Sequence, residues 1–269
     1  MPGICTTELA RRLEMAHAWR GMEYARTQAT LHPDWPVAVR AIAGGLAIHV
    51  CPGSPVNKVT GLGMHGLIHT ADWRQVEEFY QQNHASPRVD LCPLADPSLL
   101  ELLRQHAYRL QGFMNVLACA LPHEVIPLHC SPEVEVTRAG RAEGELWIRT
   151  TAQGFENAET PPPRSLDILA PNFYAVNAVP YLARVGGQPA GGGSILLHEG
   201  VAEFGGDSTH PAFRRRGVQA ALLQARLAAA HELGCDLAML LTEPGSASQR
   251  NAERAGFRVM YTNALLAAD

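Results

Sequence analysis

The stretch 201–233 constrains the fold most, because it predicts a strand, an arginine-rich turn and a long helix in direct succession. Residues 201–209 have the pattern of a strand, and residues 217–233 are rich in alanine and leucine, which favour helix. The turn between them reads His210-Pro211-Ala212-Phe213-Arg214-Arg215-Arg216-Gly217. A strand that leads directly into a helix is typical of mixed α/β folds.

This turn also has the composition of an anion-binding site. The first N–H groups of a helix lack intrahelical partners, and the helix dipole adds partial positive charge there. Gly217 removes a side chain where phosphate oxygens would approach, and the three arginines supply charge and forked donors. The segment therefore predicts a pyrophosphate-binding loop. The alternative is a solvated arginine cluster that caps a surface loop.

The rest of the chain predicts two α/β halves on either side of a proline-rich linker at 122–132. In the first half the pattern predicts helices over 4–30, 70–83 and 97–106, a hairpin over 37–50, and strands over 88–91 and 108–120. In the second half it predicts strands over 134–138, 177–185, 190–198, 236–241 and 257–266, with further helices over 147–155 and 248–254. We expect domains at 1–132 and 133–269.

A faint internal repeat supports this division. A shift of 149 residues places 91–109 on 240–258 and 70–83 on 219–232. Internal duplication explains the shift, and two unrelated halves with a common element order are the alternative. In the first half the glycine-rich segment 61–66 contains no arginine, so we expect that half to lack a phosphate loop.

Composition limits the partners and the compartment. The chain has 269 residues and a net charge of −4, which argues against a surface that coats nucleic acid. No stretch approaches the roughly 20 apolar residues that span a bilayer, and residues 1–8 lack the order of a signal peptide. The six cysteines form no CxxC pair. We expect a cytoplasmic protein with no membrane or nucleic-acid partner.

Residues 179–266 resemble the GNAT superfamily of acyl-CoA-dependent N-acyltransferases. That family carries Arg/Gln-x-x-Gly-x-Gly/Ala between its fourth strand and third helix. The segment Arg214-x-x-Gly217-Val218-Gln219 fits, except that Gln219 replaces the second small residue and Ala220 follows it. The family's next strand, turn, helix and Gly-Phe step match 237–241, 243–245, 248–254 and Gly256-Phe257.

The resemblance implies acetyl-CoA as the co-substrate and assigns residues to it. The pyrophosphate would be held by Arg214, Arg215, Arg216, Gly217, Val218, Gln219 and Ala220. The pantetheine arm would add to the exposed edge of the fourth strand at the backbone of Asp207, Ser208 and Thr209. Ser248 and Asn251 lie one turn apart on the next helix and would hydrogen-bond the pantetheine amides. The alternative for Asn251 is a solvated helix residue.

Glu203 is the candidate general base, which an attacking amine needs because it must be neutral. It lies eleven positions before Arg214, the spacing at which some members of the family carry a catalytic glutamate. On a regular strand the odd positions 201–209 would share one face. The alternative is a glutamate at a strand start, exposed or paired with an arginine.

The chain also departs from the family pattern. Ala252 and Gly245 stand where many members have a tyrosine that protonates the leaving thiolate and an asparagine. Tyr261 and Tyr174 are the nearest substitutes along the chain. His65 with His69, and His123 and His129 with Cys130, are the only metal candidates that the sequence offers, and their surroundings are poor in ligands. We therefore expect no metal site.

These patterns together predict two GNAT-like α/β domains, each a mixed, mostly antiparallel sheet flanked by helices, the first degenerate. The expected activity is transfer of an acetyl group from acetyl-CoA to an amine of a small molecule or peptide. A non-catalytic acyl-CoA-binding module is one alternative. An aminoacyl-tRNA-dependent transferase with a doubled GNAT-like fold is the other. The arginine loop and the acidic pI argue against this last reading.

Overall fold

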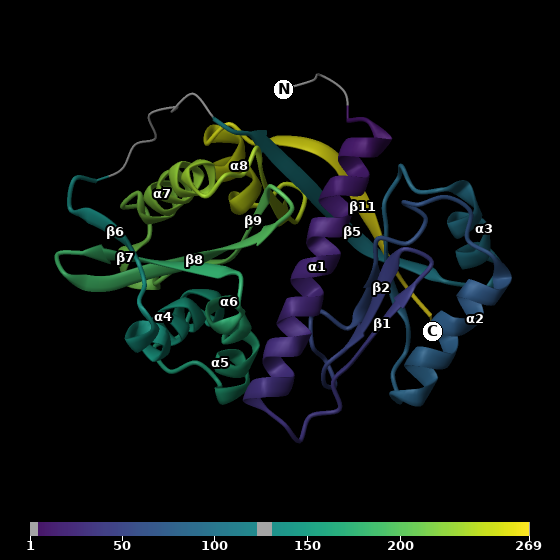
Figure 1. Cartoon of the computed structure of the whole chain (residues 1–269). Coiled ribbons are helices and arrows are strands. Elements are labelled where there is room, and N and C mark those ends of the chain that lie inside the picture. The colour runs from purple at the N-terminus through teal and green to yellow at the C-terminus, as the bar shows by residue number, and fades with distance from the viewer. Residues whose placement is uncertain (1–4, 123–130, 269) are drawn as a thin grey trace. The chain divides into compact units, whose positions relative to one another are not determined.

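The computed structural model describes residues 5–122 and 131–268, and its fold is mixed α/β as expected (Figure 1). His123, His129 and Cys130, the metal candidates of the linker, lie outside the described residues. The chain divides into two compact units. Unit 1 comprises Met1–Val116 with Val259–Asp269, and unit 2 comprises Leu117–Arg258. The division differs from the expected one at 132/133, because the last strand of the chain belongs with the first half.

The strands of unit 1 are hydrogen-bonded in the order β1-β2-β3-β4-β11-β5. Its helices pack on both faces, with α1 against β1–β3 and α2 against β1 and β2. The bounds are α1 Thr7–Leu31, β1 Ala38–Ile42, β2 Gly45–His49, β3 Lys58–Thr60, α2 Thr70–Gln82, β4 Arg88–Leu91, α3 Pro97–Gln105, β5 Arg109–Ala120 and β11 Arg258–Ala267. Strand β5 begins in unit 1 and ends in unit 2.

Local sequence explains where these helices begin. The Thr6 hydroxyl caps α1 by accepting from the N–H of Leu9 at 3.2 Å, as expected for a threonine before a helix. Asp96 caps α3 and a proline follows at its first position. The core beneath α2 and α3 centres on Trp73, Phe79, Tyr80 and Leu99. Strand β3 was not predicted, since three residues carry too little periodicity.

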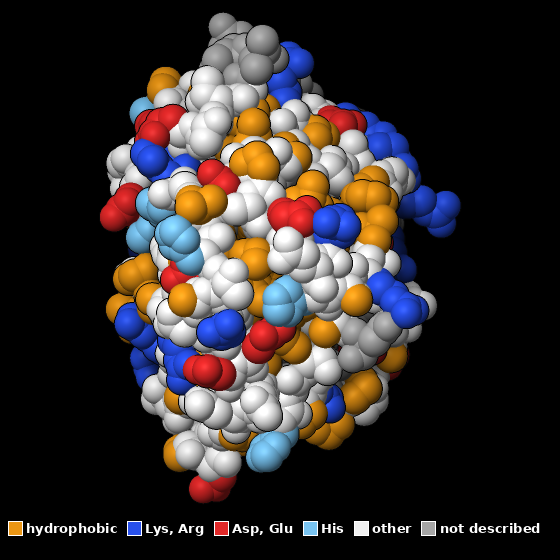
Figure 2. Space-filling model, turned by 90° about the vertical axis from the view of Figure 1, so that its right-hand side faces the viewer, with side chains coloured by type: hydrophobic (Ala, Val, Ile, Leu, Met, Phe, Trp, Pro, Cys, Tyr) orange, Lys and Arg blue, Asp and Glu red, His pale blue; other side chains and the backbone are white. Residues whose placement is uncertain are grey.

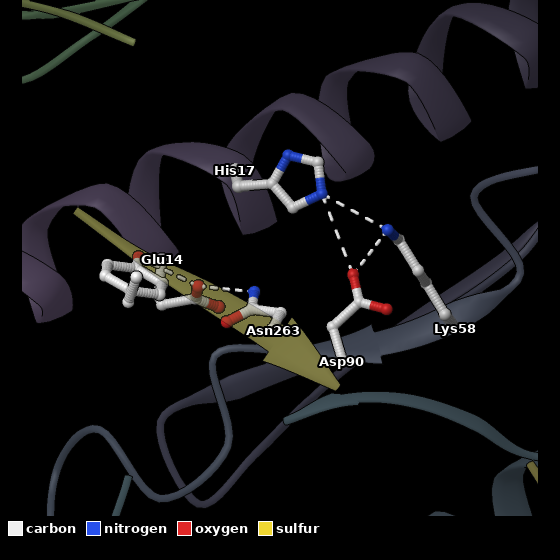
Figure 3. A network of polar contacts seen from close by, with 6 residues as sticks. Glu14, His17, Lys58, Asp90 and Asn263 are labelled. Carbon is white, nitrogen blue, oxygen red and sulfur yellow. Dashed lines mark hydrogen bonds and ion pairs between the residues drawn. The ribbon is translucent and has the colours of Figure 1, made fainter. Parts of the chain in front are cut away.

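A buried polar network joins α1 to strands of the same unit (Figure 3). Glu14 of α1 is 1% exposed, and its Oε1 accepts from Tyr261 Oη at 2.9 Å and Asn263 Nδ2 at 2.8 Å, both on β11. Beside it, Lys58 Nζ lies 2.5 Å from Asp90 Oδ2 and 3.2 Å from His17 Nε2. Burial raises the pKa of Glu14, and the nearby charge of Asp90 raises it further. The hydrogen bonds from Asn263 and Tyr261 and the charge of His17 lower this pKa but do not cancel the shift.

Glu14→Gln tests this environment. The pKa of Glu14 is higher in the folded state than its unfolded value of about 4.5. Such a carboxyl leaves the free energy of unfolding unchanged at pH values below about 4.5, and it lowers that free energy as the pH rises above this value. Glutamine keeps an acceptor for Tyr261 and Asn263 and does not ionise. We expect the variant to exceed wild type in unfolding free energy by on the order of 1 kcal/mol at pH 7.5.

Urea unfolding at pH 4.5 and 7.5 provides the measurement. The advantage of Glu14→Gln should shrink to near zero at the lower pH, where both side chains are neutral. Glu8→Gln, an exposed position on the same helix, is the control and should show no such difference. A loss of stability in Glu14→Gln at both pH values would contradict the account.

Unit 2 contains the sheet order β5-β10-β9-β8-β7-β6, with β10 parallel to β9 and the β8–β9, β7–β8 and β6–β7 pairs antiparallel. Helix α7 covers one face and α4 to α6 cover the other (Figure 1). The bounds are β6 Val134–Arg138, α4 Gly144–Glu156, α5 Pro163–Leu169, α6 Pro171–Tyr174, β7 Ala178–Val185, β8 Gln188–His198, β9 Val201–Thr209, α7 Val218–Glu232, β10 Leu237–Thr242 and α8 Ala247–Arg254, with 3-10 turns at Arg141–Glu143 and Pro211–Phe213.

The core of unit 2 lies mainly between the sheet and α7, where Ala202, Phe204, Leu222, Leu223 and Phe257 are buried. Trp147 of α4 anchors the opposite face and donates to the carbonyl oxygen of Tyr181 at 2.8 Å. Helices α5 and α6 were not predicted, because each is short and begins at a proline that reads as a loop signal.

The internal shift of 149 residues relates whole elements of the two units. It carries α2 onto α7, β4 onto β10, α3 onto α8 and β5 onto β11, and the shifted first and last residues agree to within two positions. It also carries the parallel β3–β4 pair near the parallel β9–β10 pair. The same order of elements therefore builds both sheets, which is the pattern that a duplicated fold produces.

Three further features concern the surface, the helices and the possible metal ligands. On the face in Figure 2, Lys and Arg side chains are interspersed with Asp and Glu, and hydrophobic atoms are scattered among them. Within the described residues, no helix has the length and apolar character to cross a bilayer. No group of three or more His, Cys, Asp or Glu side chains converges there as metal ligands do.

Candidate active site

A cavity of about 750 Å³ opens in unit 2 between the end of β9, the arginine turn and the starts of α7 and α8. It brings together eleven of the twelve residues that the sequence assigned to acetyl-CoA. These are Asp207, Ser208, Thr209, Arg214, Arg215, Gly217, Val218, Gln219, Ala220, Ser248 and Asn251. The remaining lining residues were not predicted, namely Gly154, Phe155, Phe213, Ala247 and Arg254.

One wall of the cavity is an unpaired strand edge. Strands β9 and β10 pair only from Val201↔Leu237 to Phe204↔Leu240. Strand β9 then continues to Thr209, so its last five residues have no β10 partner on that side. An open edge presents backbone donors and acceptors in a row, which an extended ligand arm can bind.

A β-bulge shapes this edge and corrects one expectation. The β8–β9 register shifts between Gly192 and Ser194, and Gly206 adopts φ +65°. After the bulge, the Asp207 carboxylate pairs with Arg226 of α7, whereas the Ser208 hydroxyl donates to the Thr151 carbonyl of α4 at 2.7 Å. The prediction that the odd positions 201–209 share one face is therefore wrong, because the extra residue reverses the alternation.

The arginine turn ends in the start of α7, as predicted. Gly217 precedes the helix with φ +80° and ψ 8°, a left-handed conformation that glycine adopts without steric cost. Ala221 makes the helix's first hydrogen bond to Gly217, so the N–H groups of Val218, Gln219 and Ala220 precede the ladder. No acidic residue lies in the first turn. This helix end can therefore accept an anion.

The three arginines of the turn have different partners. Arg214 donates to Asn157 Oδ1 at 2.8 Å and to the Gly154 carbonyl at 3.0 Å, which ties the turn to the end of α4. Arg215 has φ +61° and lines the cavity. Arg216 does not line it, because its guanidinium pairs with Glu133 at 2.7 Å.

A polar chain crosses the opposite wall, from α7 to α8. Asn251 Nδ2 donates to Gln219 Oε1 at 2.5 Å, and Arg254 donates to Asn251 Oδ1 at 2.8 Å. Asn251 is thus linked within the protein rather than simply solvated. Arg254 brings a cation to the cavity that sequence reasoning missed, although its position one turn after Asn251 on the same helix could have indicated it.

Glu203 is buried, at 4% exposure, and does not line the cavity. It pairs in register with Leu196 of β8 and Met239 of β10, one residue before the β9–β10 pairing ends. Its neighbours Ala202 and Phe204 belong to the core beneath α7, so Glu203 projects from the other face of the sheet.

The two tyrosines that were expected as substitutes for the missing acid make their contacts elsewhere. The Tyr261 hydroxyl donates to Glu14 Oε1 within unit 1, and burial raises its pKa above the ordinary value. The Tyr174 ring packs so closely on Gly144 that a Cβ there would lie 2.8 Å from its Cζ. Neither lines the cavity.

The corresponding junction in unit 1 is built differently. The segment between β3 and α2 buries Leu62, Met64 and Ile68 in the core of that unit. The Asp72 carboxylate accepts from the N–H of His69 at 2.9 Å and places a negative charge in the first turn of α2. An acidic side chain there opposes a bound phosphate, whereas α7 has none.

A family comparison agrees with this geometry. Residues 146–257 match the model of the Acetyltransferase (GNAT) family. This segment is a GNAT acetyltransferase domain. It includes β9, the arginine turn, α7 and α8, which contribute most of the cavity lining. The matched family is one of acetyltransferases.

Solved structures extend the likeness to the whole fold. A GCN5-related N-acetyltransferase from Kribbella flavida has a TM-score of 0.64 at 17% identity, covering 93% of this chain and 95% of that one. One from Sphaerobacter thermophilus has a TM-score of 0.57 at 19% identity, covering 74% and 66%. A tandem GNAT protein from the clavulanic acid biosynthesis pathway has 0.58 at 12%, covering 91% and 87%. No curated protein matches the chain.

Proposed function

We propose that the protein is an N-acetyltransferase that moves an acetyl group from acetyl-CoA to an amine. The observation that carries the proposal is one cavity in which the open edge of β9 meets the start of α7. An extended pantetheine arm suits the edge, and a pyrophosphate suits the helix end. A volume of about 750 Å³ lies within the usual range for small-ligand sites.

The charges around the cavity favour the nucleotide end of acetyl-CoA. Arg214, Arg215 and Arg254 line it, and the glycine at position 217 lets phosphate oxygens approach the backbone. Among the described residues that line the cavity, Asp207 has the only carboxylate, and this side chain is paired with Arg226. We assign the pyrophosphate to the backbone of 217–220 and the arm to the backbone of 207–209, with Ser248 and Asn251 facing it. Arg216 supports the turn through Glu133.

We propose Glu203 as the general base. Because Glu203 does not line the cavity, the attacking nitrogen would pass a proton to this carboxylate through a water molecule as it forms a bond to the carbonyl carbon of the thioester. The carbon–sulfur bond then breaks, and the sulfur leaves as a thiolate that takes a proton from water. Water suffices because a thiol is far more acidic than an alcohol, and Ala252 supplies no acid at the usual position.

The acceptor is proposed as an amine of a small molecule or a peptide. The second candidate is an acyl-CoA-binding module without turnover, which Ala252 favours. Unit 1 is proposed to be a GNAT-like unit without a cofactor site, because Asp72 and buried apolar side chains occupy the corresponding junction.

Calorimetric titration with acetyl-CoA, followed by an assay of thiol release with a panel of primary amines, tests the function. We expect micromolar binding at one site per chain, and amine-dependent release of the CoA thiol. Binding without release on any amine of the panel would favour the binding module. An absence of binding by the folded protein would overturn the proposal.

A further inference from the structure

Helix α7 contains a completely buried arginine that the family resemblance does not assign. The side chain of Arg226 is 0% exposed. Its neighbours along the helix are alanines and leucines, which cannot hydrogen-bond its guanidinium through their side chains. A buried guanidinium is costly unless its charge and its donors are satisfied. Its contacts therefore indicate what the position requires.

Four groups surround Arg226, and three of them come from β8 and β9. Its Nη2 pairs with the Asp207 carboxylate, and its Nη1 donates to the Ser194 carbonyl at 3.3 Å. Its Nε donates to the Leu222 carbonyl of its own helix at 3.0 Å, and its Cζ lies 4.7 Å from the centre of the Phe204 ring. Phe204 is the last β9 residue paired with β10.

The ion pair lies at the β9 bulge. Asp207 directly follows Gly206, the residue with φ +65°, and stands opposite the register shift between Gly192 and Ser194. At Gly193 a Cβ would lie 2.6 Å from Asp207 Oδ1 and 2.8 Å from Arg226 Cζ. Glycine at this position is therefore required to admit the pair. Three consecutive glycines within a strand, here Gly191–Gly193 of β8, are a sequence pattern that indicates such a close approach.

The pair also connects the two halves of the cavity. Asp207 belongs to the open edge of β9, and Arg226 belongs to the helix whose first turn follows Gly217. In the described structure, the pairing of β9 with β10 stops at Phe204 and does not extend along that edge. The Arg226–Asp207 pair supplies a fixed point in their place.

We propose that Arg226 is a positioning residue, which acts through Asp207 to hold the edge of β9 in the conformation that binds the pantetheine arm. The inference rests on the proposed function, because it assumes that acetyl-CoA binds along this edge. Arg226 itself does not line the cavity and would not touch the ligand.

The test compares the affinity for whole acetyl-CoA with that for its nucleotide end, adenosine 3′,5′-bisphosphate. Arg226→Met removes the charge, and we expect it to raise the Kd for acetyl-CoA at least about tenfold, since a buried charge partner is lost. The Kd for the nucleotide should change by less than about twofold, because the turn and the start of α7 keep their own contacts. Arg226→Lys should recover part of the affinity.

Matched variants separate positioning from stability. Leu223→Ala truncates a buried side chain of the same helix that does not line the cavity. We expect it to lower the free energy of unfolding in urea about as much as Arg226→Met does, and to leave the acetyl-CoA Kd unchanged. Arg226→Met/Asp207→Asn removes both charges, so we expect stability to return while the affinity stays low. If Arg226→Met does not fold, this double variant carries the comparison.

Three results would count against the inference. The inference would be overturned if Arg226→Met and Leu223→Ala raised the acetyl-CoA Kd equally for the same loss of unfolding free energy. It would also be overturned if Arg226→Met raised the Kd for the nucleotide as much as the Kd for acetyl-CoA. Recovery of affinity together with stability in the double variant would show that the pair acts on stability alone. Failure of wild-type protein to bind acetyl-CoA would instead reject the proposed function, on which the inference depends.

Discussion

Gly217→Asp is expected to weaken acetyl-CoA binding by a factor on the order of 100. The substitution places a carboxylate where the backbone of the arginine turn meets the first turn of α7. The ligand's pyrophosphate is negatively charged, and the proposed site offers it N–H groups at this point. Repulsion at close range, together with partial neutralisation of the helix end, removes the main attraction.

Gly217→Asn is the matched control. Asparagine and aspartate have nearly the same shape, and both tolerate the left-handed backbone that position 217 requires. The two variants therefore differ mainly in charge. We expect Gly217→Asn to lose less than about tenfold in calorimetric titration. Equal losses in the two variants would assign the effect to shape, and unchanged binding in Gly217→Asp would contradict a pyrophosphate at this helix end.

Glu203→Gln is expected to reduce kcat by roughly 10² to 10⁴ while the Kd for acetyl-CoA stays within about twofold. The carboxylate is buried near the end of the β9–β10 pairing and does not line the cavity. Glutamine conserves its shape and removes its ability to take a proton. The loss should therefore appear in turnover rather than in binding of the co-substrate.

The measurement combines calorimetry with a thiol-release assay on an amine that wild type accepts. Glu199→Gln provides the control, since Glu199 is an exposed glutamate at the β8–β9 turn and should retain full turnover. Full turnover in Glu203→Gln would reject Glu203 as the base. A parallel loss of acetyl-CoA affinity would indicate that Glu203 supports the fold of β9 instead.

Local pattern was sufficient to predict most elements. The alternation over 201–209 and the alanine- and leucine-rich run after Gly217 correspond to β9 and α7 within one residue. The β9 and α8 residues of the cavity lining were assigned through the resemblance to the GNAT family. The turn itself predicted an anion-binding loop, because a helix that starts after a glycine-ended turn offers free N–H groups. Here the sequence signal and the physical cause lie within the same few residues.

Longer-range features were not predictable in the same way. The bulge at Gly206 depends on the partner strand, so alternation alone placed Asp207 on the wrong face. The burial of Arg226 depends on Gly193 and Asp207, which lie 33 and 19 positions away in the sequence. The assignment of β11 to unit 1 depends on its pairing with β4, whose register no local pattern records.

That last pairing has a consequence for how the protein is made. Strand β4 pairs antiparallel with β11, from Leu91↔Ala264 to Arg88↔Ala267, so unit 1 takes one of its inner strands from a segment that follows unit 2 in the sequence. During synthesis, every other strand of that unit emerges from the ribosome before its neighbour β11 exists. Until then β4 is an unpaired edge that can associate with other chains. Unit 1 therefore cannot complete its sheet until residues 258–267 have been made, and a gene fragment that stops before them produces an incomplete sheet.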